Sequence, residues 1–371
     1  MVKTECTMEV LDLNLFDNIY ENKRVLVTGH TGFKGSWLSL WLSELGAKVF
    51  GLSLSPDSVL SHWDLLNLPI NDYNCDIRDA VAVDQIIKSI QPEIIFHLAA
   101  QPLVRRSYRD PLETWSTNVM GTVNLLEACR HNASVKAIVV ITTDKCYENY
   151  EVSRGYREDD RLGGYDPYSA SKAGSELVAA SYRRAFFDNE NGTLLATARA
   201  GNVVGGGDWS EDRLIPDLIR AVSKQESLEV RSPNATRPWQ HVLESLSGYL
   251  LLGEKLYIGC KDLAGPWNFG PRLDGNRSVL EVLRMFNKVW EDINWHQTTC
   301  TQPHESKLLY LDSNKAHTQL NWSPVWDIDR TIEKTADWYK QWYHNGNVVS
   351  RQQLANFIAD ARCANIRWSK N

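Results

Sequence analysis

The chain has 371 residues, 43% hydrophobic and 23% charged, as is typical of a soluble globular protein with one large or two coupled domains. A formal net charge of −6 argues against general affinity for nucleic acid. The seven cysteines are scattered and form no C-x-x-C pair, so neither a disulfide framework nor a zinc site is predicted. No run approaches transmembrane length and the acidic N-terminus does not resemble a signal peptide, so we expect a cytoplasmic protein.

The first strong pattern lies at residues 24–38, RVLVTGHTGFKGSWL. An apolar run at 25–28 predicts a buried strand, and the helical spacing of later apolar residues predicts a helix over 36–45. Three glycines recur every third residue between them: Gly29, Gly32 and Gly35. Such a turn points backbone N–H groups and the positive end of a helix at an anion, for which a pyrophosphate is the natural occupant. An ordinary glycine turn is the alternative.

Apolar strands then alternate with helical patterns up to about residue 200. The expected strands are 49–54, one that ends at 74, 93–98, 137–142 and 194–199, and the expected helices are 80–90, 117–131 and 168–187. This alternation predicts an α/β fold with a Rossmann-type, doubly wound parallel sheet.

The second half of the chain is less regular. Its expected elements are a glycine-rich loop at 205–209, helices at 213–223, 244–256, 279–290 and 331–343, and strands near 228–231 and 265–270. We interpret residues 23–200 as a dinucleotide-binding domain, to which a segment near 240–260 returns. Residues 201–346 are expected to form mainly a smaller C-terminal α/β substrate lobe. Residues 1–22 would be a polar lead-in, and 347–371 a polar, helical tail.

The end of the second strand bears on the choice of dinucleotide. Many NAD proteins carry an acidic residue there that holds the adenosine ribose. Residues 53–56 lack one, and Asp57 comes too late for a clear match. No arginine stands there to pair with a 2′-phosphate, so NAD is favoured over NADP. Asp76, after the third strand, is interpreted equally well as a helix cap or as a ligand-binding residue.

Tyr168 and Lys172 lie four residues apart in an expected helix and therefore share one face. An ammonium near a phenol lowers the pKa of the phenol, so such a tyrosine can accept a hydroxyl proton near neutral pH. A surface tyrosine and lysine would be the alternative. The position of this pair after a dinucleotide turn favours catalysis.

Thr143, Asp144 and Lys145 directly follow the apolar strand 137–142. Ligands bind at the carboxyl ends of the strands in parallel sheets. Thr143 can hydrogen-bond a substrate hydroxyl, and the next two residues place a carboxyl and an amine at the mouth of the site. An exposed, ion-paired turn is the alternative.

Several segments together resemble the nucleotide-sugar 4,6-dehydratases, within the extended short-chain dehydrogenase/reductase superfamily. They are TGHTGFKGSWL, HLAAQPLVRRSY, TNVMGT, TTDKCYEN, GGYDPYSASK, RAGNVVGGGDW and RPWQHVLE, and the resemblance runs from about residue 23 to 326. The first, the TDK and the last segments are typical of the branch that acts on CDP-glucose. The resemblance implies NAD-dependent conversion of CDP-glucose to CDP-4-keto-6-deoxyglucose for deoxysugar and polysaccharide biosynthesis. The alternatives are a 4,6-dehydratase or 4-epimerase of another nucleotide sugar, and a non-catalytic NAD-binding regulator.

The resemblance implies a division of labour among the candidate catalytic residues. Tyr168 would take the proton of the sugar 4-hydroxyl with help from Lys172 and Thr143. Asp144 would protonate the departing C6 hydroxyl. Lys145 stands where relatives that act on dTDP-glucose carry a glutamate, and it could be the base at C5 or could stabilise an enolate by its charge. A 4-epimerase needs no such Asp-Lys pair, so the pair favours a dehydratase.

The resemblance also implies the binding residues. Those expected at the cofactor are Gly29, Thr31, Gly32, Phe33, Lys34, Gly35, Asp76, Ile77, Ala99, Ala100, Gln101, Asn118, Tyr168 and Lys172. Those expected at the substrate are Gln101, Arg199, Asn202, Arg213 and Arg237, the last as a clamp on the nucleotide phosphates. No metal site is expected, and His97 and His241 are interpreted as structural. Residues 149–153, NYEVS, depart from the family pattern, which carries a tryptophan there.

The helices expected at 117–131 and 168–187 match the segments through which family members form a four-helix bundle across a dimer. The resemblance therefore implies a homodimer or homotetramer. We expect neither a nucleic acid nor a membrane as a partner.

Overall fold

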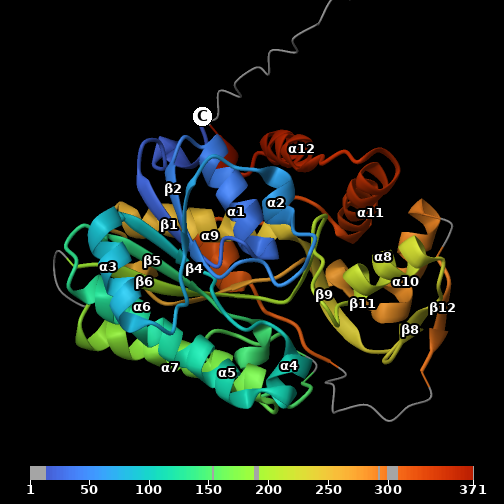
Figure 1. Ribbon diagram of the computed structural model, residues 1–371, viewed down its shortest axis with the longest axis horizontal. Coiled ribbons are helices and arrows are strands. Elements are labelled where there is room, and N and C mark those ends of the chain that lie inside the picture. Colours follow the sequence, from blue (N-terminus) through green and yellow to red (C-terminus); the bar gives the residue numbers. More distant parts are fainter. Residues whose placement is uncertain (1–13, 153, 188–191, 291–292, 299–307, 371) are drawn as a thin grey trace, which may run out of the picture.

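A seven-stranded parallel β-sheet runs through the protein (Figure 1). The computed structural model describes residues 14–152, 154–187, 192–290, 293–298 and 308–370. The strands of this sheet are β1 (Arg24–Thr28), β2 (Lys48–Ser53), β3 (Asn71–Asn74), β4 (Ile94–His97), β5 (Ala137–Ile141), β6 (Leu194–Ala200) and β10 (Pro266–Phe269). They lie in the order β10-β6-β5-β4-β1-β2-β3, with every neighbouring pair parallel. This order confirms the predicted Rossmann-type fold.

Some of the described helices cover the faces of the main sheet, and others lie in the smaller lobe (Figure 1). They are α1 (Phe33–Glu44), α2 (His62–Leu66), α3 (Ala80–Ile90), α4 (Val104–Arg109), α5 (Pro111–Trp115), α6 (Gly121–Arg130), α7 (Pro167–Ala185), α8 (Leu214–Lys224), α9 (Val242–Tyr257), α10 (Val279–Val289), α11 (Ile328–Asn345) and α12 (Ser350–Cys363). Helices α8 and α10 are among those in the smaller lobe. Shorter helical turns are η1 (Phe16–Asn18), η2 (Ser116–Met120), η3 (Asp144–Cys146), η4 (Lys261–Leu263), η5 (Leu273–Gly275), η6 (Ala316–Leu320) and η7 (Arg367–Ser369).

Alternate residues of a strand point to opposite faces of the sheet, and β1 shows what each face buries. Val25 and Val27 belong to the core cluster that contains the apolar residues of α1 and α9. Leu26 belongs to the cluster formed with α3 and α6. Helix α9 packs against β4, β5 and β6 of the main sheet, and the assignment of this segment to the first domain stays a prediction.

Strand β10 joins the sheet beside β6, although it lies far along the chain. The sequence predicted a strand near residues 265–270 but assigned it to the second lobe. Trp267 of β10 is fully buried, so the pairing contributes to the core of the main sheet. The proposed lobe boundaries stay a prediction.

The smaller lobe is built on two short sheets beside the main one (Figure 1). Their strands are β7 (Asn202–Val204), β9 (Thr236–His241) and β11 (Asn276–Ser278) in one sheet, and β8 (Leu228–Val230) and β12 (Trp295–Gln297) in the other. Strand β7 follows β6 almost directly, and β9 leads into α9. These two connections join the lobe firmly to the carboxyl edge of the main sheet.

Several helix starts differ from the predictions, among them that of α11, which begins at Ile328 and not at residue 331. Helix α1 begins at Phe33, three residues early, because the glycine turn leads into it without an intervening loop. The helix expected at 117–131 is preceded by α5, which begins at Pro111 after the cap Asp110, and the wide turn η2 joins α5 to α6. A side-chain cap followed by proline at the first helical position is a strong start signal, which the sequence analysis did not use.

The C-terminal segment is helical, as expected, but its apolar side chains are buried. Phe357 and Trp368 both contact Trp41 of α1, and Trp368 stacks on Phe16 with 5.2 Å between ring centres. The segment therefore completes the core on the α1 face. In the described part of the chain, no helix is both long and apolar enough to cross a membrane.

Three histidines are buried as neutral rings, which confirms the structural interpretation of His97 and His241. Desolvation lowers the pKa values of His62, His97 and His241 to about 3. The His97 ring nitrogens bond the hydroxyls of Thr28 and Thr122 at 2.7 and 3.2 Å.

We expect His62→Gln to make stability less sensitive to acid. Between pH 6.5 and 3 the unfolded chain binds more protons at His62 than the folded protein does, so the free energy of unfolding falls as pH falls. One such histidine contributes up to about 1.4 kcal/mol per pH unit. Glutamine can still bond Ser36 and Ser350, which contact the ring at 2.8 and 2.7 Å. Urea unfolding at pH 7 and pH 5 measures the effect, and equal pH dependence in both proteins would contradict it.

Candidate active site

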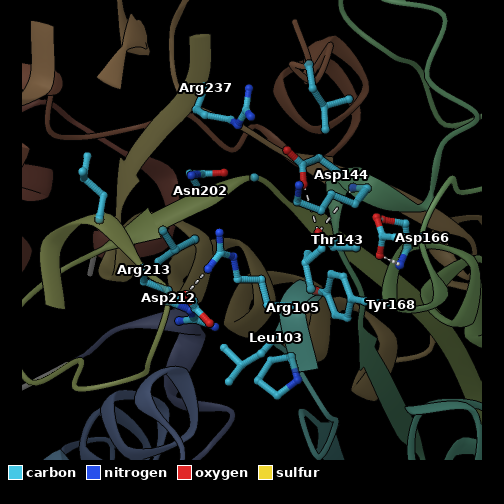
Figure 2. Close-up of a pocket in the computed structure, with 18 of the residues that line it drawn as sticks. Leu103, Arg105, Thr143, Asp144, Asp166, Tyr168, Asn202, Asp212, Arg213 and Arg237 are labelled. Carbon is cyan, nitrogen blue, oxygen red and sulfur yellow. Dashed lines mark hydrogen bonds and ion pairs between the residues drawn. The ribbon is translucent and has the colours of Figure 1, made fainter. Parts of the chain in front are cut away.

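A cavity of about 900 Å³ opens at the carboxyl ends of β5 and β6, between the main sheet and the smaller lobe (Figure 2). The predicted site residues in its wall are Lys34, Thr143, Asp144, Lys145, Tyr168, Asn202, Arg213 and Arg237. They come from the glycine turn, the segment after β5, the start of α7, β7, the start of α8, and β9. The cavity therefore brings together the two catalytic patterns and most of the predicted substrate contacts.

The segment after β5 places a buried carboxyl group in the cavity. Thr143 caps the turn η3: its Oγ1 donates to Asp144 Oδ1 at 2.9 Å and accepts from the Lys145 amide at 3.3 Å. Asp144 is 2% exposed, and its buried Oδ2 has no hydrogen-bond partner within the described residues. Desolvation raises the pKa of Asp144 despite the opposing charge of Lys145 and the hydrogen bond from Thr143. The group thus retains a proton more readily than an exposed aspartate.

Tyr168 lies in the first turn of α7, where Asp166 fixes the helix start. Asp166 accepts from the Ser169 amide at 2.9 Å and from its hydroxyl at 2.6 Å. Burial raises the pKa of Tyr168 to about 12, while a hydrogen bond with Thr143 and the charge of Arg213 act to lower it. Because burial raises this pKa, loss of the Tyr168 proton near neutral pH depends on nearby hydrogen bonds and positive charges.

Lys172 lies one turn beyond Tyr168, as predicted, but its amine has another partner. Nζ donates to the carbonyl of Ile141 at 3.2 Å. Desolvation lowers the pKa of Lys172 to about 8, although Glu176 opposes the shift. The sequence analysis expected the ammonium of Lys172 to lower the Tyr168 pKa. In the structure, burial is the largest influence and raises this pKa, and the influences that lower it are the hydrogen bond with Thr143 and the charge of Arg213.

The glycine turn has the close packing that its sequence predicts. Gly29 has φ = +73°, and a Cβ there would lie 2.7 Å from the Ala99 nitrogen, so the turn touches the loop after β4. A Cβ on Gly35 would overlap the Gly29 carbonyl. Thr31 Oγ1 donates to the carbonyl of Leu54 at 2.9 Å, which ties the turn to the end of β2.

The start of α1 is suited to an anion. The first N–H groups of a helix have no partner inside the helix. Gly32 is the N-cap, and none of the described side chains caps the helix start. These amides and the helix dipole therefore fit a pyrophosphate.

Arg199 is a correction to the predicted substrate contacts. Its guanidinium donates to Glu176 through Nε and Nη2 at 2.9 and 2.8 Å, and to the Tyr147 hydroxyl at 2.6 Å. The side chain is almost fully buried and is missing from the described residues that line the cavity. A buried arginine without a carboxylate partner would be costly, so Arg199 and Glu176 form an internal pair behind the cavity wall.

Gln101 and Asn118 also lie behind the wall. Asn118 accepts from the Gln101 amide at 2.8 Å and donates to Ser171 Oγ at 2.8 Å. The Gln101 side chain donates to Thr114 and Leu103. Both side-chain amides thus connect the loop after β4 to η2 and α7. Contacts of Gln101 and Asn118 with the cofactor, and of Gln101 with the substrate, stay predictions.

Asp76 is not the cap of α3, because Asp79 accepts from the Val81 and Ala82 amides instead. The Asp76 carboxylate is held by Arg78, with a closest distance of 2.5 Å. Ile77 is buried against the position of Gly121. Contacts of Asp76, Ile77, Ala99 and Ala100 with a cofactor stay predictions.

Several charged residues in the cavity wall were missed by the sequence analysis. We call four of them the rim cluster: Arg105, Asp212, Asp217 and Arg231. Asp212 Oδ1 lies 3.3 Å from Arg105 Nη1 and 3.2 Å from Arg231 Nη2 (Figure 2 shows the first contact). Asp217 Oδ2 lies 3.7 Å from Arg231 Nη2. Among the members of the rim cluster, only Arg105 lies in a segment that carries the family resemblance, HLAAQPLVRRSY. The other three are distant from it in the chain, so no local pattern links them to it.

Residues 26–258 match the family model described as GDP-mannose 4,6 dehydratase. A curated relative, the CDP-glucose 4,6-dehydratase of Salmonella typhimurium, is 45% identical over 351 residues, which cover 92% of this chain and 98% of the relative. The solved structure of epimerase Mth375 from Methanothermobacter thermautotrophicus has a TM-score of 0.79 at 22% identity, covering 91% of this chain and 96% of that one. DesIV, a dTDP-glucose 4,6-dehydratase from Streptomyces venezuelae solved with NAD and TYD bound, has a TM-score of 0.72 at 24% identity, covering 86% and 97%. These two structures support the fold.

Proposed function

The chain belongs to the GDP-mannose 4,6 dehydratase family, and we propose that it catalyses the NAD-dependent 4,6-dehydration of CDP-glucose to CDP-4-keto-6-deoxyglucose. The observation that carries this proposal is the buried carboxyl of Asp144 beside Tyr168 and Thr143 in one cavity. A dehydratase needs an acid to release the C6 hydroxyl as well as a base for C4 oxidation, and this cavity offers both. The CDP-glucose 4,6-dehydratase of Salmonella, similar over nearly its whole length, supports the choice of substrate.

The glycine turn and the start of α1 fit the pyrophosphate of NAD, with Gly29, Gly32 and Gly35 allowing the close approach. NAD, when bound, supplies the acceptor for the C4 hydride and the donor that returns it to C6. At the end of β2, Thr31 Oγ1 and Ser53 Oγ lie 2.8 Å apart and offer neutral hydroxyls. This neutral surface supports NAD in preference to a cofactor with a 2′-phosphate.

Tyr168 is proposed to accept the proton of the sugar 4-hydroxyl. Thr143 is proposed to hydrogen-bond both the Tyr168 hydroxyl and the sugar 4-hydroxyl. The positive charge of Arg213 favours the phenolate, because it is one of the influences that lower the Tyr168 pKa. Arg213 is itself held by Asp208 at 3.0 Å. Its position on the cavity wall is consistent with a second role at the substrate phosphates.

Asp144 is proposed to give a proton to the departing C6 hydroxyl. Burial raises the pKa of Asp144 and so favours its protonated form, and Oδ2 is the oxygen left for the substrate. Lys145 is the adjacent cation in the wall, placed to accept the C5 proton or to stabilise the enolate by its charge. Arg237, on β9, is proposed to bind the diphosphate.

Incubation of the purified protein with CDP-glucose tests the proposal directly. The 4-keto product absorbs ultraviolet light in alkali, and mass spectrometry would show the loss of one water. The matched panel is dTDP-, UDP- and GDP-glucose. Turnover of one of these without turnover of CDP-glucose would contradict the substrate, while interconversion of sugar epimers without loss of water would contradict the dehydratase.

We also propose that the protein is a cytoplasmic homodimer or homotetramer joined along η2, α6 and α7, the segments expected from the sequence, and along the neighbouring α5. These elements pack side by side on one face of the molecule (Figure 1). They expose large apolar side chains there: Leu112, Trp115, Met120 and Leu177. A second copy would remove this apolar surface from water.

Leu177→Glu combined with Leu112→Glu is expected to yield a monomer, because two charges would be buried in the interface. Leu112 and Leu177 are 81% and 61% exposed in the single chain, so the changes leave its core intact. Size-exclusion chromatography with light scattering measures the mass. Leu273→Glu, at an exposed site on the smaller lobe, is the matched control. A wild-type monomer, or a double variant with the wild-type mass, would contradict this interface.

A further inference from the structure

We propose that Arg231 and Asp217 recognise the polar edge of the cytosine ring and thereby set the preference for a cytidine nucleotide, an inference that rests on the proposed function. Both residues line the cavity and belong to the rim cluster. Arg231 lies at the end of β8, and Asp217 lies in the first turn of α8.

The position of the rim cluster along the cavity suits the nucleoside. The reacting sugar must lie at Thr143 and Tyr168, at the edge of the main sheet. Arg237, on β9 of the smaller lobe, is the proposed phosphate contact. Residues 228–232, at the end of β8 in the same lobe, also line the cavity. We infer that a base attached beyond the diphosphate lies against Arg231.

This part of the cavity has apolar walls that suit a flat ring. Leu214, Val230 and Val279 contribute from α8, β8 and α10, and all three line the cavity. Apolar faces with a few polar groups at one edge are typical of pockets for small planar ligands. Arg231 and Asp217 supply that polar edge, with side chains 28% and 26% exposed.

The two side chains match cytosine and oppose uracil and thymine. The cytosine edge presents two acceptors, O2 and N3, followed by the donor N4–H₂. Uracil and thymine present a donor at N3 and an acceptor at O4. A guanidinium only donates and a carboxylate only accepts. Arg231 can therefore donate to O2 and N3 while Asp217 accepts from N4, whereas with uracil both the N3 and O4 positions are mismatched.

Neighbouring residues hold this pair in place without using all of its hydrogen-bonding capacity. Arg220 donates to Asp217 Oδ1 and is anchored to the carbonyls of Trp209 and Ser210, both at 3.0 Å. Asp217 Oδ2 lies 3.7 Å from Arg231 Nη2, beyond hydrogen-bond distance. Asp212 accepts from Arg231 at 3.2 Å. The Arg231 guanidinium and the Asp217 carboxylate are thus held in place by their neighbours. N–H donors of Arg231 and one oxygen of Asp217 remain for a ligand.

Steady-state kinetics with CDP-glucose and UDP-glucose tests the assignment in Arg231→Gln and Asp217→Asn. Arg231→Gln should lower kcat/KM for CDP-glucose by about 10- to 100-fold, the usual effect of losing a bidentate base contact. The loss should appear in KM, with kcat retained, because the sugar end is unchanged. Asp217→Asn should raise the relative use of UDP-glucose, because its amide can donate to O4. Arg284→Gln, at an exposed site on α10, should change neither substrate.

An unchanged ratio of kcat/KM for the two substrates in both folded variants would overturn the inference, as would an equal loss with both substrates. Failure of the proposed function is distinguishable, because wild type would then leave CDP-glucose unconverted. Calorimetric titration with CMP and UMP tests recognition without catalysis. A wild-type preference for CMP that Arg231→Gln removes supports the assignment, and equal affinities of wild type for CMP and UMP overturn it.

Discussion

Tyr168→Phe should abolish C4 oxidation of the nucleotide sugar while leaving dinucleotide binding intact. Removal of a general base typically slows a reaction by about 10²- to 10⁴-fold, and here every later step depends on the 4-ketone. The phenyl ring keeps the packing of the first turn of α7, where Tyr168 is buried. The loss is therefore expected in kcat rather than in folding. Single-turnover measurements of reduced cofactor, together with product formation, would show it.

The matched control is Tyr182→Phe on the same helix. The Tyr182 hydroxyl bonds Glu127 at 3.0 Å, and Tyr182 is absent from the described residues of the cavity wall. Its loss should leave oxidation near the wild-type rate. Calorimetry with NAD should give similar affinities for wild type and both variants. Normal oxidation by Tyr168→Phe would contradict the assigned base, and loss of NAD binding would show that the hydroxyl serves the cofactor instead.

Local sequence patterns were sufficient to predict that Thr143, Asp144 and Tyr168 line one cavity. Thr143 and Asp144 come directly after an unbroken apolar strand, and the carboxyl ends of parallel strands share one edge of the sheet. Tyr168 follows the cap Asp166 and Pro167. Each position depends on residues within a few places along the chain, so it could be predicted without tertiary contacts.

The supporting contacts could not be predicted in this way. Arg199 and Glu176 are 23 residues apart, and Arg105 and Asp212 are 107 apart. From the sequence alone, Arg199 and Arg105 could each contact a phosphate. Only the folded structure shows that each is paired with a carboxylate, Glu176 or Asp212. Asn118 was expected at the cofactor from the family resemblance, and the sequence alone does not show that its side-chain amide bonds Gln101 and Ser171.

The buried face of α12 had a local signal that went unused. Leu354, Phe357, Ile358 and Ala361 recur at helical spacing within an otherwise polar segment, and all four are buried. The average polarity of residues 347–371 hid that stripe. The pairing of β10 with β6 is different, because no local pattern distinguishes an edge strand of the main sheet from a strand of the smaller lobe.

Asp144→Asn should separate the two halves of the proposed reaction. Asparagine keeps the shape of the buried side chain but cannot deliver a proton to the C6 hydroxyl, so elimination should slow by about 10²- to 10⁴-fold. Oxidation at C4 needs Tyr168 and should persist. Reduced cofactor should then accumulate with a 4-keto sugar that still carries its 6-hydroxyl, which absorbance and mass spectrometry can follow in one turnover. Asp159→Asn, at an exposed site, is the control.

The pH dependence supplies a second test of Asp144. Desolvation raises the pKa of this carboxyl, so the protonated acid persists to higher pH and disappears as pH rises through that pKa. Wild-type elimination should slow over that rise, while Asp144→Asn should lose the dependence. Elimination by Asp144→Asn at the wild-type rate would assign the acid to another group. It would also remove the structural feature that separates this site from that of a 4-epimerase, since oxidation by Tyr168 alone serves both reactions.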